Sequence, residues 1–81
     1  MTVTELINEM KQQFELEKIH IINNTENMVM FGGSLDNYEN PISAHELKAE
    51  TDNMIVENYM MHLAKDLYIF TNDTWSFRKE G

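Results

Sequence analysis

The sequence of 81 residues predicts one small domain, 1–81, of the α+β class. Three stretches indicate this class: a capped amphipathic segment at 3–13, two apolar runs around a polar break at 19–31, and a β-branched and aromatic run at 67–71. We therefore expect an N-terminal helix packed on a small, mostly antiparallel sheet of three to four strands, with a short second helix.

The first predicted helix begins behind a capping box, in which Thr2 and Glu5 have the required spacing. Apolar residues then recur at helical steps and form one stripe: Val3, Leu6, Ile7, Met10 and Phe14. This pattern predicts a helix from Val3 to about Gln13.

A β-hairpin is predicted next, with strands at 19–23 and 28–31. The break Asn23–Asn27 suits a turn, because Asn side chains bond to nearby backbone and tolerate left-handed conformations. The second strand is apolar on both sides, which indicates that it is central in the sheet or covered by helices. Gly32 and Gly33 then predict a bulge or a sharp exit from the sheet.

The segment Ser34–Pro41 is expected to be a polar connection. Ser43 and Glu46 match a second capping box, so a short helix is expected from Ala44 to about Glu50.

Two interpretations remain open for residues 54–64. Apolar residues recur there at three- and four-residue steps, which suits a helix, but the segment also suits a strand. The run Leu67–Thr71 strongly favours strand, and pairing it with Met54–Leu63 would complete a four-stranded sheet. We therefore favour the strand pair.

The charge distribution is the main functional signal. The formal charge is −8, and no basic residue lies between Lys18 and Lys48. Such a surface repels nucleic acid and anionic membranes and steers the protein toward a basic protein surface. A simpler alternative is that the acidity only maintains solubility. The candidate partner-binding carboxylates are Asp36, Glu39, Glu46, Glu50, Asp52 and Glu57.

No motif for catalysis, metal or cofactor binding is present, so we expect a protein that is not an enzyme. The histidines, His20, His45 and His62, lack the four-residue spacing that places two imidazoles on one helical face. The absence of cysteine suits a reducing cytoplasm. No apolar run approaches the roughly 20 residues of a membrane helix.

Aromatic residues and methionines offer a second kind of binding surface. Residues 72–81 are expected to form a tail or an edge strand, and its Trp75 and Phe77 either close one edge of the core or anchor a partner. The seven methionines fill the core or form an adaptable surface. The alternative function is therefore a structural or oligomerisation module, with a homodimer as one form.

The opening Thr-Val-Thr-Glu-Leu-Ile, the helix and hairpin, and the acidic balance resemble small accessory proteins of phages and prophages of Gram-positive bacteria. Some proteins of that kind are anti-defence inhibitors, including anti-CRISPR proteins whose acidic surfaces occupy nucleic-acid channels. The resemblance implies a phage-type inhibitor in the host cytoplasm that mimics nucleic acid and blocks a basic groove of a host defence nuclease. It assigns no role to a particular residue.

Overall fold

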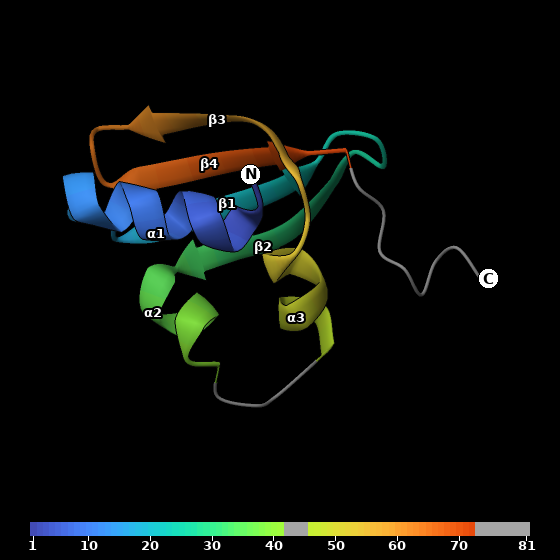
Figure 1. Ribbon diagram of the computed structural model, residues 1–81, viewed down its shortest axis with the longest axis horizontal. Coiled ribbons are helices and arrows are strands. Elements are labelled where there is room, and N and C mark those ends of the chain that lie inside the picture. Colours follow the sequence, from blue (N-terminus) through green and yellow to red (C-terminus); the bar gives the residue numbers. More distant parts are fainter. Residues whose placement is uncertain (42–45, 73–81) are drawn as a thin grey trace.

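Four strands form one mixed sheet, and three helices lie on one side and beyond one edge of it (Figure 1). The structure is a computed structural model that describes residues 1–41 and 46–72. The elements in chain order are α1 (Val3–Gln13), β1 (Lys18–Asn23), β2 (Met28–Ser34), α2 (Leu35–Glu39), α3 (Glu46–Asp52), β3 (Val56–His62) and β4 (Asp66–Thr71). The α+β prediction is confirmed. Among the described residues, no helix has the length and apolar character needed to cross a membrane.

The strand order is β2-β1-β4-β3, so β1 and β4 occupy the centre of the sheet. The outer pairs, β1 with β2 and β3 with β4, are antiparallel, whereas the central pair is parallel. A parallel pair needs a long crossover connection. Here the crossover contains β2, α2, α3 and β3, which brings residues some 48 positions apart into register, as with Ile19 and Leu67.

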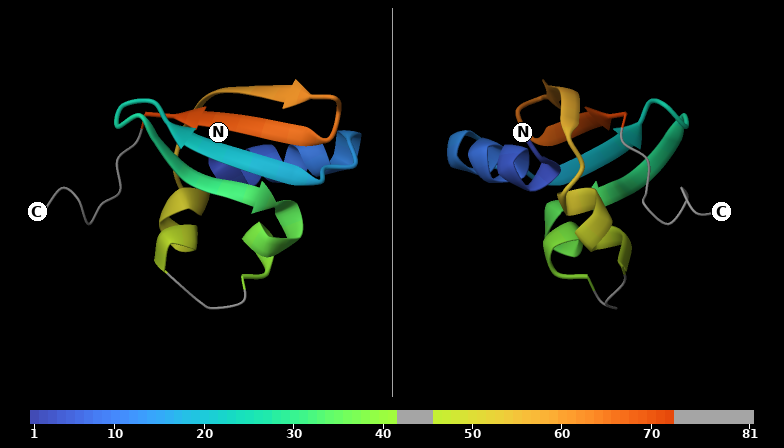
Figure 2. Two further views of the ribbon diagram at one scale, coloured as in Figure 1. Left: turned by 180° about the vertical axis from the view of Figure 1, so that it is seen from behind. Right: turned by 45° about the vertical axis from the view of Figure 1, so that its right-hand side comes forward.

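The core lies between α1 and one face of the central strands (Figure 2). Because side chains alternate across a strand, every second residue of β1 and β4 points toward α1 and is fully buried. The apolar members of this set are Ile19, Ile21, Leu67 and Ile69, and α1 covers them with Val3, Leu6, Ile7 and Met10.

Local signals at the two ends of this core agree with the sequence. The Thr2 hydroxyl accepts from the Glu5 amide at 3.2 Å, and the Glu5 carboxylate accepts from the Thr2 amide at 2.8 Å, which completes the predicted capping box. These hydrogen bonds to Thr2 lower the pKa of Glu5. In the hairpin turn, Asn23 Oδ1 accepts from the Glu26 amide at 3.0 Å and Asn27 has a φ of 52°.

The strand interpretation of residues 54–64 is confirmed, because β3 pairs with β4 along its length. The pairing is irregular between Val56 and Asn58, which leaves Glu57 without a directly opposed partner residue in β4. The tight turn that follows holds Leu63 and Ala64 at positive φ.

Three sequence predictions were wrong in part. The polar connection at 34–41 contains the helix α2, and β2 is an edge strand rather than a central one. Gly32 and Gly33 remain paired within β2, and the irregularity of this hairpin lies instead between Ile21 and Ile22 of the partner strand. A Cβ at Gly33 would lie 3.5 Å from the Phe31 ring, which is an ordinary van der Waals contact.

The second predicted helix is present as α3, and it extends two residues beyond Glu50. Its predicted start at Ala44 lies outside the described residues. The side of β2 that faces α2 and α3 carries Phe31, whose ring packs edge-on against Tyr38 with centroids 5.0 Å apart. This contact accounts for the apolar residue on that face of β2, whereas Val29 on the other face is 65% exposed.

The face of the sheet opposite α1 is covered by none of the described helices (Figure 2). We call it the open sheet face; its side chains are Val29 of β2, Lys18, His20 and Ile22 of β1, Asp66, Tyr68 and Phe70 of β4, and Asn58, Met60 and His62 of β3.

The packing of one sheet face against α1 predicts that substitutions of buried and exposed isoleucines differ in their effect on stability. Ile21→Val should lower the free energy of unfolding by about 1 kcal/mol, because Ile21 is fully buried and the change leaves a small void. Ile55→Val is the matched control, since Ile55 is 52% exposed, and it should change stability by less than about 0.5 kcal/mol. Urea denaturation measures both, and equal losses would contradict the assigned core.

Candidate functional site

The six carboxylates predicted from the sequence fall on three elements. Asp36 and Glu39 lie on α2, Glu46, Glu50 and Asp52 on α3, and Glu57 on β3. Since α2 and α3 line the same hollow, the first two groups belong to one side of the molecule. In contrast, β3 is the sheet edge opposite β2, so the structure separates Glu57 from the others (Figure 1). For Glu46 only the backbone is described, and Trp75 and Phe77 lie outside the described residues.

Helix α2 begins directly after β2 because Ser34 caps it. The Ser34 hydroxyl accepts from the Asn37 amide at 3.1 Å, and the exposed Asp36 lies in the first turn, where the helix dipole favours an anion. The amide group of Asn40 donates to the Asp36 carboxylate at 3.3 Å. Asp36 is thus presented to solvent on a well-defined helical turn.

Two of the predicted carboxylates form ion pairs with lysines. Lys11 Nζ lies 2.8 Å from Glu39 Oε2 and connects α1 with α2, and Lys48 Nζ lies 2.6 Å from Asp52 Oδ2 within α3. Both pairs are partly exposed, so each contributes a modest amount to stability. The Glu39 pair therefore connects two helices, whereas the Asp52 pair stabilises α3 itself.

Asp52 is the centre of a partly buried network that joins the three helices. The Tyr38 hydroxyl of α2 donates to Asp52 Oδ1 at 2.6 Å, and Lys48 lies 4.9 Å from the centroid of the Tyr38 ring. The Thr4 hydroxyl of α1 donates to the Asp52 carbonyl at 3.2 Å. Burial, and then the hydrogen bond and charge of Asp52, raise the pKa of Tyr38 strongly.

Sequence reasoning missed two members of this network, Tyr38 and Lys48. The four-residue spacing of Lys48 and Asp52 is a helical ion-pair signal that could have identified the lysine. Nothing in the sequence links Tyr38 to Asp52, because their contact depends on how α2 packs against α3.

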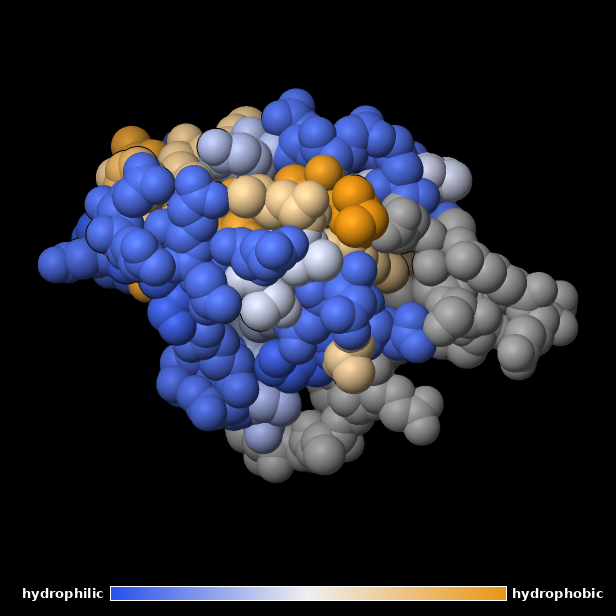
Figure 3. Space-filling model, in the orientation of Figure 1, coloured by the Kyte–Doolittle hydropathy of each residue, from blue (hydrophilic) through white to orange (hydrophobic). Residues whose placement is uncertain are grey.

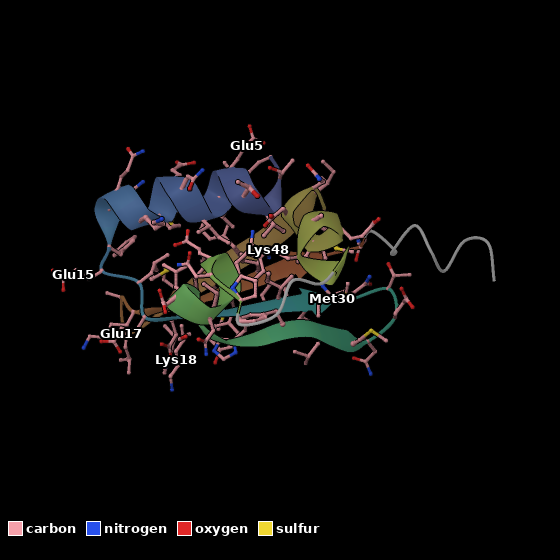
Figure 4. All side chains as sticks on the ribbon, turned by 90° about the horizontal axis from the view of Figure 1, so that it is seen from below. Glu5, Glu15, Glu17, Lys18, Met30 and Lys48 are labelled. Atoms are coloured by element: carbon pink, nitrogen blue, oxygen red, sulfur yellow. The ribbon has the colours of Figure 1, made fainter. Side chains whose placement is uncertain are left out.

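A hollow of about 200 Å³ lies between β2, α2 and α3. Its lining is mostly apolar. Two of the lining residues, Met30 and Lys48, are labelled in Figure 4. This volume is below the usual range for small-molecule sites. Within the described part of the chain, no three histidine or acidic side chains gather as metal ligands.

The negative charge is concentrated on the helical side of the molecule. We define the acidic helical layer as residues 2–17, 35–41 and 46–52, which contain the three helices and segments that flank them. This layer holds nine of the fourteen acidic residues and two of the six basic residues, which amounts to −7 of the formal charge of −8. Its surface is largely hydrophilic over α1 and α2 (Figure 3). Glu5 points away from the sheet, and Glu15 and Glu17 lie at the far end of α1 (Figure 4).

The network around Asp52 predicts a stability loss on removal of one hydroxyl. Tyr38→Phe should lower the free energy of unfolding by about 2 kcal/mol at neutral pH, because the Asp52 carboxylate loses a charge-assisted hydrogen bond. Tyr59→Phe is the matched control, since Tyr59 is 43% exposed, and it should leave stability nearly unchanged. Urea denaturation at neutral pH measures both variants.

The same hydroxyl predicts a pH dependence in alkaline solution. An unfolded tyrosine ionises near pH 10, whereas the raised pKa of Tyr38 keeps its proton in the folded state. Above about pH 10 the unfolded state therefore binds fewer protons, and stability falls by up to about 1.4 kcal/mol per pH unit from this group. Tyr38→Phe should lack this contribution and Tyr59→Phe should retain it. Identical pH profiles for the wild type and Tyr38→Phe would contradict the assignment.

Comparison of the chain with known protein families, with curated proteins and with solved structures found no match. The function is therefore inferred from the charge, shape and contacts of the molecule.

Proposed function

We propose that this chain is a non-enzymatic binding protein whose acidic helical layer enters a basic groove of a nucleic-acid-binding protein and mimics nucleic acid there. The observation that supports it is the separation of charge between the two sides of the fold. Residues 18–34 and 55–72, which form the sheet, hold three acidic and two basic residues, whereas the acidic helical layer has nine and two. A surface of one sign attracts a partner surface of the other.

Exposed carboxylates on successive helical turns supply the repeated negative charge that such mimicry requires. Glu5 and Glu9 are exposed along α1, Glu15 and Glu17 follow it, and Asp36 is exposed at the start of α2. Nucleic acid presents a regular series of negative phosphates, and proteins that bind it contact those phosphates with lysine and arginine. A rigid helical scaffold with regularly placed carboxylates is suited to the same contacts.

The ion pairs within the layer refine the set of binding residues. Glu39 and Asp52 are paired with Lys11 and Lys48, so they contribute less to a partner than the sequence alone suggests. Glu17 likewise lies 3.4 Å from Lys65 Nζ. Glu57 belongs to the sheet edge and is excluded from the proposed surface. We therefore assign the main role to Glu9 and Asp36, which are exposed and appear in none of these three ion pairs.

The partner class follows from the charge and from the family resemblance together. The charge calls for a basic groove, and the resemblance to phage accessory proteins implies a host defence nuclease. A guide-RNA-dependent nuclease is the first candidate, because its nucleic-acid channel is lined with positive charge.

This proposal predicts a position-dependent and salt-dependent loss of binding. Glu9→Gln and Asp36→Asn should each weaken binding to a purified guide-RNA-dependent nuclease by about threefold to tenfold, because each removes one charge from the contact. Glu57→Gln is the matched control: it removes the same charge from an exposed site outside the layer and should leave the affinity nearly unchanged. Fluorescence anisotropy with labelled protein measures the dissociation constants.

Rising salt should weaken the wild-type complex, since screening reduces the attraction between exposed charges. A complex whose affinity is the same at low and high salt would refute the mimicry. Equal effects of Glu57→Gln and Glu9→Gln would show that net charge, rather than the acidic helical layer, controls binding.

A further inference from the structure

Each of the four strands contributes an apolar side chain to the open sheet face, and its side chains lie in rows set by the strand register. One row is Val29, Ile22, Phe70 and Asn58, and the next contains His20, Tyr68 and Met60. The rings of His20 and Tyr68 are stacked with centroids 4.3 Å apart. Val29 is 65% exposed and Met60 is 50% exposed. Contiguous exposed apolar surface of this kind marks an interaction site in soluble proteins.

The charge of this face differs from that of the rest of the chain. Its only formal charges are Lys18 and Asp66, which are register partners on β1 and β4 and cancel. Figure 4 shows Lys18 pointing to the side of the sheet opposite α1. A basic partner would find no excess negative charge here, so electrostatic attraction directs such a partner to the acidic helical layer instead. The open sheet face suits an occupant that is itself apolar and neutral.

A second copy of the same face is such an occupant, because β1 and β4 lie side by side and in register at the centre of the sheet. These two strands run in the same direction. A two-fold axis parallel to these strands and lying above the line between them therefore places β1 of one copy over β4 of the other. Such an isologous contact superposes each row of the face on the same row of the second copy.

Between the central strands, the superposition is complementary at each of three rows; in the outer strands, Val29 of one copy meets Asn58 of the other. The stacked pair of His20 and Tyr68 meets the same pair in reverse order, and Ile22 meets Phe70. At the end of the strands, Lys18 of each copy meets Asp66 of the other, so two opposite-charge contacts form.

We propose that the open sheet face is the interface of a two-fold symmetric homodimer, with β1 of each copy packed over β4 of the other. Two sheets packed face to face lie about 10 Å apart. Each acidic helical layer then lies on the far side of its own sheet, beyond the Debye length of about 8 Å, so repulsion between the two negative layers is largely screened.

Analytical ultracentrifugation of the full chain tests the interface. The wild type should sediment as a dimer, and Met60→Glu should raise the dissociation constant by about tenfold or more, because it places two carboxylates in the apolar contact. The matched control is Tyr59→Glu, since Tyr59 is the neighbouring residue on β3, is exposed to a similar extent and points to the other side of the sheet. It should leave the dimer intact.

A mixing experiment tests the symmetry. Lys18→Glu alone and Asp66→Lys alone should each weaken the dimer, because each change brings like charges together across the interface. An equimolar mixture of the two variants should restore dimer formation, since the heterodimer regains two opposite-charge contacts. This rescue distinguishes a defect at the interface from a defect inside one protomer. Each chain in the mixture still carries its own substitution, so a defect inside the protomer would persist in the mixture.

Four outcomes would overturn the proposal. A wild type that stays monomeric up to about 1 mM excludes a useful dimer. In that case, a change in the fluorescence of Trp75 on Met60→Glu would assign the face to residues 73–81 of the same chain. Equal weakening by Met60→Glu and Tyr59→Glu would locate the contact at the edge of β3. Failure of the Lys18→Glu and Asp66→Lys mixture to recover association would refute the symmetry.

Discussion

The structure depends on the burial of one face of the parallel pair β1 and β4. Ile19, Ile21, Leu67 and Ile69 are fully buried against α1, and they are brought together although β1 and β4 lie far apart in the sequence. In a domain of this size the core is small and stability is limited, so these four side chains and the helix that covers them determine whether the fold forms. The alternation of side chains then leaves the other face of the same strands without a helix.

This arrangement divides the surface into two parts with different chemistry. The helices need only one apolar stripe each to bury the core, and residues 2–17, 35–41 and 46–52, which contain these helices, carry nine of the fourteen acidic residues. The central strands contribute Ile22, Tyr68 and Phe70 to the open sheet face, where Lys18 and Asp66 cancel. The contrast between the parts is a consequence of topology, since β1 and β4 supply both the core and the open face.

Local signals in the sequence predicted the elements that have them. The capping box at Thr2 and the apolar stripe behind it identify α1, and the Asn-rich break identifies the hairpin turn. α2 was missed because five residues are too few for a periodic pattern, and its cap at Ser34 has no acidic residue three positions later. The edge position of β2, the parallel central pair and the contact of Tyr38 with Asp52 are nonlocal, so no spacing in the sequence reveals them. For the same reason, the separation of Glu57 from the other candidate carboxylates became visible only in the sheet order.

The two proposed surfaces are compatible because they use opposite sides of one layer of strands. In the proposed dimer the open sheet faces are buried, and the two acidic helical layers point away from each other. A partner groove that binds one layer therefore leaves the other layer free. Where a partner presents two basic grooves at a matching distance, the second contact becomes intramolecular and avidity exceeds the affinity of either layer alone. In this proposal, self-association and binding of a basic partner are thus separable, since each uses its own residues of a single small fold.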